Sequence, residues 1–424
     1  MQTKLNLISE IAKRDGESKI NNLAYLLNEE NLKDCFSLLS KGKAAGIDGV
    51  TLEEYGANLD SNLENLVQRM KNQAYKPQPV RRTYIPKAYG KLRPLGIPSL
   101  EDKIVQKGMA RILESIYENE FLDSSYGFRP SKNCHQALKK LNDIIYKQPV
   151  NHIIDADIKG FFDNVDHDWL MKFLEVRISD PNFLRLIKRF LKNGYMEEGI
   201  KHATDTGTPQ GGIVSPILAN IYLHYVLDLW IDRALKPNCR GTVEIVRYAD
   251  DFVICVQYKD EANKILIALK ERLKKFNLEL AEDKTRLIEF GKFAKTNANA
   301  KAKSRAGAFK IGRKTDKKKS KLKMIGMNTW LKDVRNLIPI KELWKTFRAK
   351  LRGHFQYYGV SENYRSIKMF YQESLKLMYK WLNRRSQKKS FNWKTFLVYI
   401  GRFELPQPSI HHDFYSFKSS FREY

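Results

Sequence analysis

The chain has 424 residues, of which 42% are hydrophobic and 12% aromatic, enough for a large core and too many for one ordinary domain. Its 75 Lys and Arg outnumber its 48 Asp and Glu, and the formal net charge of +27 indicates a polyanionic partner. The four cysteines lie far apart without a CxxC pair, and no N-terminal targeting pattern is visible, so we expect neither a zinc site, a disulfide framework nor secretion.

The first part of the chain is predicted to mix helices and strands. Residues 1 to about 60 have helical character, with a GIDGV turn at Gly46–Val50, and residues 81–98 alternate extended segments with turn residues. The segment NHIIDADI (151–158) predicts a strand that ends at acidic residues. After Lys159 and Gly160, apolar residues recur at helical spacing from Phe161 to Phe173.

The longest apolar stretch runs from Ile213 to Ile231 and allows two interpretations. Its length approaches that of a membrane span. However, Asn220, His224 and Asp228 recur every four residues and would form one polar stripe on a helix. We therefore expect a buried amphipathic helix and no membrane association.

The segment VEIVRYADDFVICVQ predicts a hairpin with two carboxylates, Asp250 and Asp251, at its tip. If this tip lies beside the end of the strand 151–158, Asp157 faces Asp250, and the carboxylates repel each other unless cations are bound. Hard oxygen ligands suit Mg²⁺, and two such ions roughly 3.5–4 Å apart can promote nucleotidyl transfer. The alternative is a plain polar turn, where Asp is ordinarily favoured.

The positive charge is concentrated in the last third of the chain. Residues 291–424 hold 32 Lys and Arg against 8 Asp and Glu, which accounts for +24 of the net charge. Between 291 and 323 apolar residues are sparse and Asp316 is the only acid, so we predict a basic linker or a nucleic-acid-binding loop. A solvated basic tail without a specific partner is the alternative.

Three helices are predicted after this segment. Apolar residues recur at three- and four-residue steps from Trp344 to Tyr358, a second helix capped by Ser361 would run to Leu382, and a third would span about 390–401. Basic residues between the apolar positions would give this bundle a surface suited to phosphates.

Together these motifs resemble reverse transcriptases, and closely resemble the group II intron-encoded reverse transcriptase/maturase family. The resemblance covers nearly the whole chain and rests, in family order, on GIDGV, RRTYIPKAYGKLRPLGIPSLEDKIVQ, SSYGFRPSKNCHQAL, DADIKGFFDNVDH, GTPQGGIVSPILANIYL, RYADD, LELAEDKTRLIEFGKF and RGHFQYYGV. It implies an α+β right-hand polymerase, with fingers and an antiparallel palm sheet, followed by an all-helical thumb/maturase region. The implied domains are a helical N-terminal extension (1–60), fingers and palm (61–290), a basic linker or loop (291–335) and a thumb/maturase domain (336–424).

The resemblance also implies roles for individual residues. Asp157 and Asp250 would be the principal metal ligands and catalytic residues, with Asp251 the adjacent acid and the Ile158 carbonyl completing the site. Around the nucleotide, Lys87 and Arg93 would clamp the triphosphate. Phe162, or alternatively Phe161, would crowd the ribose 2′-position.

In the PQGG loop, Gln210 and Gly211 would contact the nucleotide. Lys284 would donate a proton to pyrophosphate or would be an ordinary surface lysine, while Tyr248 and Ala249 would shape the primer end. The residues expected to bind nucleic acid are Arg313, Lys314, Lys317, Lys318, Lys319, Lys345, Arg348 and Arg352.

The implied activity is RNA-directed DNA synthesis with two Mg²⁺ ions, for which Mn²⁺ would substitute. Partners would be group II intron RNA or another RNA template, a DNA primer or target, and deoxynucleoside triphosphates, in the bacterial cytoplasm or nucleoid. A splicing-only RNA-binding maturase and a related polymerase redeployed in phage defence or repair are the alternatives.

Two features depart from the family pattern. The FLGF-type strand that grips the primer is not found after FGKF, where Ala308 and Phe309 are the nearest apolar residues. No Cys/His-rich endonuclease domain follows the three predicted helices, so we expect no cleavage of a DNA target by this chain.

Overall fold

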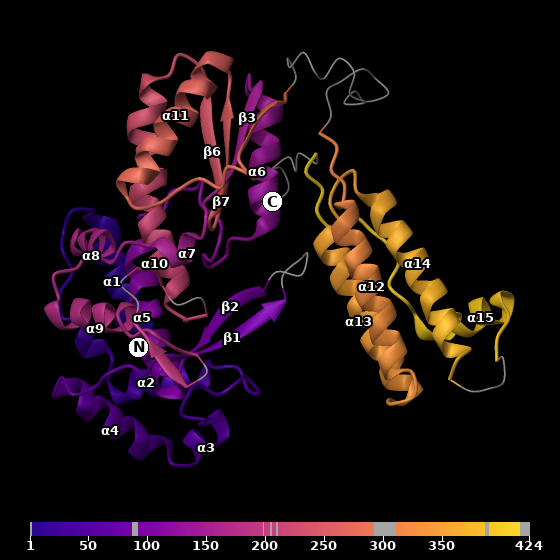
Figure 1. Cartoon of the computed structure of the whole chain (residues 1–424), viewed down its shortest axis with the longest axis horizontal. Helices are drawn as coiled ribbons and strands as arrows, with labels where there is room; N and C mark the ends of the chain where they lie inside the picture. Colours follow the sequence, from indigo (N-terminus) through magenta and orange to yellow (C-terminus); the bar gives the residue numbers. More distant parts are fainter. Residues whose placement is uncertain are drawn as a thin grey trace, which may run out of the picture. The chain divides into compact units, whose positions relative to one another are not determined.

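The computed structural model describes residues 2–86, 92–197, 199–203, 206–208, 211–291, 311–385 and 390–415. The chain forms two compact units, Met1–Asn299 and Ala300–Tyr424, called here the N-terminal and C-terminal units. Figure 1 shows their elements in sequence colours.

Short amphipathic helices begin the N-terminal unit. They are α1 (Gln2–Arg14), η1 (Ala24–Leu26), α2 (Glu29–Ser37), α3 (Leu52–Ala57) and α4 (Leu59–Lys71). In α1, Leu5, Ile8 and Ala12 recur every three or four residues and are buried. Helix α3 begins with a capping box, in which the Thr51 hydroxyl accepts from the Glu54 amide at 3.2 Å.

The extended segment predicted over residues 81–98 forms an antiparallel pair of strands, β1 (Val80–Pro86) and β2 (Leu92–Ile97). Two short strands, β4 (Tyr195–Glu197) and β5 (Ile200–His202), extend this sheet in the order β2-β1-β4-β5. Strand β4 runs parallel to β1.

A second sheet is antiparallel throughout, as predicted, in the order β6-β7-β3-β8. Its strands are β3 (His152–Asp157), β6 (Val243–Tyr248), β7 (Asp251–Val256) and β8 (Arg286–Glu289). Helix α6 (Cys134–Lys147) packs along β6, and α11 (Lys259–Lys275) packs against β3 and β7. The hairpin and the acidic strand end are therefore neighbours in one sheet.

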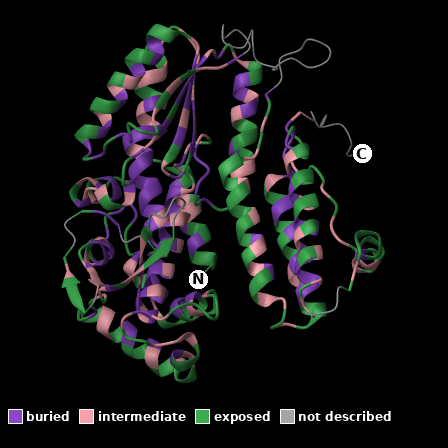
Figure 2. Ribbon diagram, turned by 45° about the vertical axis from the view of Figure 1, so that its right-hand side comes forward, coloured by how far each residue is buried: buried purple, intermediate pink, exposed green. Residues whose placement is uncertain are grey.

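A continuous hydrophobic core joins the second sheet to α5 (Leu100–Tyr117), which contributes Ile104, Val105 and Ile112 at 0% exposure. Buried residues follow the inner faces of helices and strands in Figure 2. Three further helices cover this core: α7 (Phe161–Asn164), α8 (His167–Glu175) and α9 (Pro181–Leu191).

The single helix predicted from Phe161 to Phe173 is interrupted at Val165 and Asp166. The reason is local, because the Asp166 carboxylate accepts a hydrogen bond from the Trp169 amide at 2.9 Å and starts a new helix.

The apolar stretch from Ile213 forms a buried helix. Helix α10 (Ser215–Leu223) continues into the π-helical turns η3 (His224–Asp228) and η4 (Trp230–Leu235). Within the described ranges, no helix is long and apolar enough to cross a membrane.

The C-terminal unit is a bundle with its own core. Its helices are α12 (Lys317–Val334), α13 (Ile340–Tyr358), α14 (Tyr364–Leu382) and α15 (Trp393–Ile400). Leu331, Phe347, Leu351, Ile367 and Phe396 are all 0% exposed and lie in one hydrophobic cluster.

Two details of this unit differ from the predictions. Part of the segment expected to be a linker or loop (291–335) is the helix α12, because Met327 and Leu331 form an apolar stripe that the many lysines obscure in the composition. Helix α14 begins after Asn363 and not after Ser361, whose hydroxyl donates to the Asp413 carboxylate at 2.8 Å.

A buried carboxyl in α5 predicts a pH-dependent stability. Burial raises the pKa of Asp102 to about 6, although Tyr75 and the Gln78 amide donate hydrogen bonds to it. The folded state therefore binds the proton more tightly than the unfolded state. The associated stabilisation, about 3 kcal/mol, is complete below about pH 4 and is lost as the pH rises through about 6.

We expect Asp102→Asn to reduce the pH dependence of the urea midpoint of the N-terminal unit between pH 4 and 7, because Asp251, whose pKa is also raised, remains. Asp168→Asn, which changes an exposed Asp, is the matched control and should keep the wild-type profile. Identical profiles for Asp102→Asn and the wild type would contradict the prediction.

Candidate active site

Three carboxylates meet where the central strands of the second sheet end. Asp157 is the last residue of β3, and the sheet register pairs it with Asp251, the first residue of β7. Asp250 lies in the two-residue turn between Tyr248 and Asp251, which pair across β6 and β7. The sequence predicted that Asp157 faces Asp250, but the residue directly opposite is Asp251, because the short turn places Asp250 outside the ladder.

The electrostatics of these carboxylates show that they act on one another. Burial raises the pKa of Asp250, and Asp157 raises it further. The pKa of Asp251 rises to about 6, first through burial and then through the charges of Asp250 and Asp157. Confining like charges in this way favours the binding of a cation between them.

Lys284 supplies a positive charge to this site. Its ammonium donates to the Asp157 carboxylate, an ion pair in which the Lys284 side chain is 55% exposed and that of Asp157 is 15% exposed. The chain around Lys284 is attached to the end of β3, since the Ala281 amide donates to the Asp157 carbonyl at 2.8 Å. The hydrogen bond to Asp157 raises the pKa of Lys284.

The oxygen ligands available at this site fit a hard divalent cation only in part. Carboxylate oxygens are the ligands that Mg²⁺ prefers, and these carboxylates are mutually repulsive. Across the described part of the chain, however, no group of three or more His, Cys, Asp or Glu is already arranged to hold a metal ion. Lys284 pairs with one oxygen of the Asp157 carboxylate, so this lysine and a metal ion would compete for Asp157.

A buried arginine network holds the hairpin turn. Arg247, in β6, forms an ion pair with Asp228 at 2.6 Å, and both side chains are 0% exposed. Arg247 also donates to the Asn220 side chain at 3.0 Å, the Ser125 hydroxyl at 2.7 Å and the Ala249 carbonyl at 3.0 Å. With two bonds to Asp228, all five guanidinium N–H donors are used.

The turn that carries Asp250 is confined from a second side. Ala249 has a φ of 58°, which is unusual for a residue with a side chain. A Cβ atom at Gly127 would lie 2.2 Å from the Ala249 amide nitrogen, so only glycine permits this approach. Asn220 donates to the Gly127 carbonyl at 2.7 Å and links this contact to the Arg247 network.

The sequence predictions did not include Arg247 or Gly127. They included Asn220 and Asp228, but not as partners of a buried arginine. The predicted polar stripe of Asn220, His224 and Asp228 divides in the structure. Asn220 and Asp228 bind Arg247, whereas His224 packs against the edge of Phe121 at 5.6 Å, and burial lowers its pKa to about 4. Two polar residues eight positions apart on a buried helix were the available sign of a buried cation.

The structure describes only some of the residues that were expected to contact the nucleotide. Lys87 and Gln210 lie outside the described residues. Arg93, on β2, is exposed, and its charge lowers the pKa of Asp250, which indicates that it lies toward the carboxylates. Gly211 has a φ of 111°, and a Cβ there would lie 2.5 Å from the Gly96 carbonyl oxygen, so this glycine allows contact with the backbone of β2.

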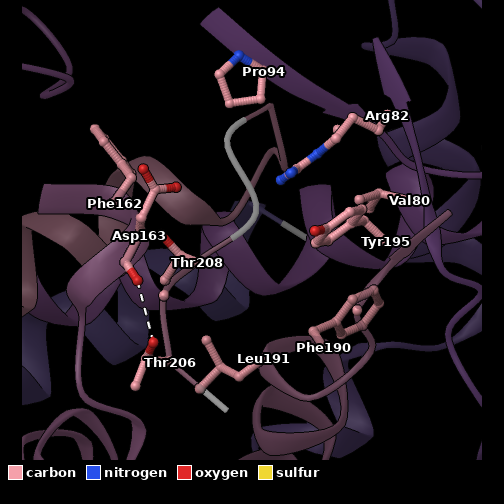
Figure 3. Close-up of a pocket in the computed structure, with 13 residues that line it drawn as sticks. Val80, Arg82, Pro94, Phe162, Asp163, Phe190, Leu191, Tyr195, Thr206 and Thr208 are labelled. Carbon is pink, nitrogen blue, oxygen red and sulfur yellow. Dashed lines mark hydrogen bonds between the residues drawn. The ribbon is translucent and has the colours of Figure 1, made fainter. Parts of the chain in front are cut away.

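Of the two candidate rings, Phe161 is 2% exposed and lies in the core, whereas Phe162 is half-buried and lines a cavity of 270 Å³ (Figure 3). Phe162 is therefore the ring that a ligand can reach.

Two other residues expected at the site are also described. The Ile158 backbone is paired with Leu280, and Tyr248 is 40% exposed.

The residues expected to bind nucleic acid lie in the C-terminal unit and differ in their surroundings. Lys314, Lys317, Lys318, Lys319, Lys345 and Arg352 are exposed. Arg348 is half-buried, and the Arg313 guanidinium lies over the Phe414 ring at 4.7 Å. The apolar pair Ala308 and Phe309, at the place of the missing primer-grip strand, lies outside the described residues.

Comparison with known proteins identifies the family of this chain. Residues 85–329 match the family model for reverse transcriptase (RNA-dependent DNA polymerase). The group II intron-encoded protein LtrA of Lactococcus lactis subsp. cremoris is 31% identical, over 82% of this chain and 71% of LtrA. This chain belongs to the group II intron-encoded reverse transcriptases.

Other relatives extend the same relationship. Protein YkfC of Escherichia coli K12 is 37% identical to this reverse transcriptase, over 61% of the chain and 75% of YkfC. The putative COX1/OXI3 intron 2 protein of Saccharomyces cerevisiae is 39% identical over 45% of the chain and 22% of its own length. The reverse transcriptase match includes Asp157, Asp250 and Asp251, and the enzyme is an RNA-directed DNA polymerase.

Removal of the Arg247 guanidinium from its buried network should cause a large loss of stability. In Arg247→Met the buried Asp228 charge has no counter-ion, and we expect a cost of about 3–5 kcal/mol. Hydrogen exchange of the β6 and β7 amides across a urea series measures this in the N-terminal unit alone. The double variant Arg247→Met/Asp228→Leu should recover most of the loss.

The matched control is Lys270→Met, which removes a cation from an exposed ion pair with Glu282 and should cost less than about 1 kcal/mol. A loss below about 1 kcal/mol for Arg247→Met would show that the network is not required for the fold.

Proposed function

We propose that this reverse transcriptase joins deoxynucleotides by two-metal nucleotidyl transfer, and that it also binds its group II intron RNA, assists splicing and copies the RNA during retrohoming. The observation that carries the first part is the register of Asp157 with Asp251 beside the turn that holds Asp250. Like charges held this close suit a site for divalent cations.

The carboxylates of Asp157, Asp250 and Asp251, with the Ile158 carbonyl, would hold two Mg²⁺ ions or Mn²⁺ in their place. When bound, these ions would supply activation of the primer 3′-hydroxyl and stabilisation of the departing pyrophosphate. The Arg247 network would keep the turn rigid, so that Asp250 stays at the end of β7 while Lys284 exchanges partners.

Residues around the carboxylates would position the nucleotide. Arg93, with Lys87, would bind the triphosphate through charge-assisted hydrogen bonds. Phe162 would exclude the ribose 2′-hydroxyl, and Gln210 with Gly211 would contact the nucleotide. Lys284 would protonate the pyrophosphate as it leaves, once its ammonium is no longer paired with Asp157.

The proposed architecture is a right hand. The sheet that contains β1 and β2 would form the fingers, the sheet that contains β3 and β7 would form the palm, and residues 1–60 would be a helical extension. The C-terminal helices would serve as thumb and maturase domain, with the bundle beginning at α12 and not at residue 336. The basic linker before α12 would be shorter than the predicted segment 291–335.

Binding of intron RNA would use the basic surface of the C-terminal unit. Its exposed lysines and arginines can neutralise RNA phosphates, with an affinity that falls steeply as salt rises. The intron-encoded relatives support this role over one in phage defence or repair. DNA primers and deoxynucleoside triphosphates would be the remaining partners.

Primer extension tests the catalytic proposal. With an RNA template, a DNA primer, deoxynucleotides and Mg²⁺, Asp250→Ala/Asp251→Ala should reduce the rate at least about a hundredfold, because the metal ligands are removed. Asp155→Asn, which changes an exposed carboxylate of the neighbouring strand β3, should extend the primer like the wild type. If the wild type fails to extend and still accelerates splicing of its intron RNA, the splicing-only alternative is correct.

The Lys284–Asp157 ion pair predicts competition between this lysine and a metal ion. In Lys284→Met, the affinity of the nucleic-acid-free protein for Mn²⁺ should rise about twofold to fivefold, while primer extension becomes slower. Calorimetry measures the affinity without catalysis. Lys159→Met is the matched control, because it removes a nearby exposed ammonium that pairs with Glu279 at 3.6 Å. Equal affinities in the two variants would contradict direct competition.

A further inference from the structure

A cavity of 270 Å³ lies between the first sheet, helices α7 and α9 and residues 206–208 (Figure 3). The apolar and aromatic part of its walls is formed by Val80, Pro94, Phe162, Phe190, Leu191 and Tyr195. The volume is slightly below the range of about 300–1,000 Å³ usual for small-molecule sites. A ligand as small as a nucleobase or nucleoside suits this cavity.

The cavity is separate from the face of β2 that carries Arg93. Successive side chains of a strand point to opposite faces, so Arg93 and Leu95 lie on one face and Pro94 and Gly96 on the other. Pro94 and Gly96 line the cavity, whereas the Leu95 side chain lies on the Gly211 side of the strand. Phe162 is the residue that the cavity shares with the proposed nucleotide site.

A hydrogen-bond donor and an acceptor line this cavity. The Arg82 guanidinium stacks on the Tyr195 ring, 3.5 Å from its centroid, and its buried Nε atom has no hydrogen-bond partner within the described ranges. Asp163 also lines the cavity. Burial raises the pKa of its carboxyl and the Arg82 charge lowers it, although the described contacts include no direct ion pair between these two side chains.

A third polar group, the Thr208 hydroxyl, also lines this cavity. Thr208 is 3% exposed, and its hydroxyl has no hydrogen-bond partner in the described part of the chain. By contrast, the neighbouring Thr206 hydroxyl donates to the Asp163 carbonyl at 3.2 Å. Buried polar groups without partners are rare, and the presence of two, the Arg82 Nε atom and the Thr208 hydroxyl, at one cavity indicates that a polar ligand completes them.

This combination matches the edges of one base. Guanine presents the N1–H and N2–H donors together, which suit a carboxylate, and the O6 and N7 acceptors, which suit an arginine. Its ring can also stack on aromatic side chains. Adenine lacks the paired donors that a carboxylate would accept.

We propose that this cavity binds a guanine base, with Asp163 accepting from N1–H and N2–H and Arg82 donating to O6 or N7. Thr208 would hydrogen-bond to a remaining polar atom of the base or its ribose, and Phe162 would contact the bound ring. The base would come from a free guanine nucleoside or from a guanosine of an RNA strand. The proposal does not depend on the two-metal mechanism.

Equilibrium dialysis of labelled guanosine with the full chain tests this proposal. Guanosine carries no phosphate, and omission of divalent metal prevents occupation of the proposed triphosphate site. We expect saturable binding of guanosine, with inosine at least about tenfold weaker because it lacks the N2 amino group, and adenosine weaker still. Failure of guanosine to saturate, or equal binding of the three nucleosides, would overturn the proposal without the use of any variant.

Two variants test the assigned contacts. Asp163→Asn should abolish the preference for guanosine over inosine, and Arg82→Met should weaken both. Arg81→Met is the matched control, because Arg81 is the next residue of β1 and its side chain donates to the Ala45 carbonyl at 2.8 Å, away from the cavity. Unchanged guanosine preference in Asp163→Asn, with a native circular dichroism spectrum, would overturn the assignment.

A competition experiment identifies the source of the base. A short uridine oligonucleotide with one central guanosine should displace labelled guanosine if the cavity takes a base from an RNA strand, whereas the same oligonucleotide with inosine should displace it poorly. Displacement by free guanosine alone would assign the cavity to a small-molecule ligand. Displacement by the all-uridine oligonucleotide as effectively as by guanosine would show that base recognition is absent.

Discussion

The buried ion pair between Arg247 and Asp228 is the constraint on which the rest of the catalytic unit depends. A guanidinium without exposure to solvent must have a partner for every N–H group. Arg247 finds these partners on Ser125, on Asn220 and Asp228 of the α10–η3 helical stretch, and on Ala249 of its own hairpin turn. By satisfying them it joins α10 and η3 to the central sheet and holds the carbonyl of Ala249 in the turn. The position of Asp250 follows from this arrangement, because the same turn carries it.

The distribution of charge separates two tasks of the molecule. The N-terminal unit carries little net charge and confines three carboxylates, with Lys284 and Arg93 as the cations that act on them. The C-terminal unit carries most of the excess positive charge on the surface of a bundle with its own apolar core. In the proposed function, binding of RNA phosphates would use side chains of a different unit from the carboxylates, so basic residues could be numerous without being placed among the acids that metal ions would bind.

Much of the fold was predictable because local patterns and tertiary packing agree. The β-branched residues of 152–157 and 243–256 form strands, and the apolar spacing in 344–358 and 364–382 forms helices. The predictions failed where a single contact outweighs the pattern. Asp166 caps a new helix inside a continuous apolar repeat, and two buried residues, Met327 and Leu331, hold a helix together in a segment whose composition is typical of a linker.

The sequence by itself determined the family of this protein and the candidates for its chemistry, namely the carboxylates, the strands that carry them and the basic residues, because residue types and their spacing are local properties. Only the tertiary structure decided how these parts face one another. It placed Asp251 opposite Asp157, left the ring of Phe162 and not that of Phe161 accessible, and brought Arg82 and Asp163 to one cavity. These outcomes depend on strand register and on contacts between residues far apart in the chain, and no local pattern of residues specifies either.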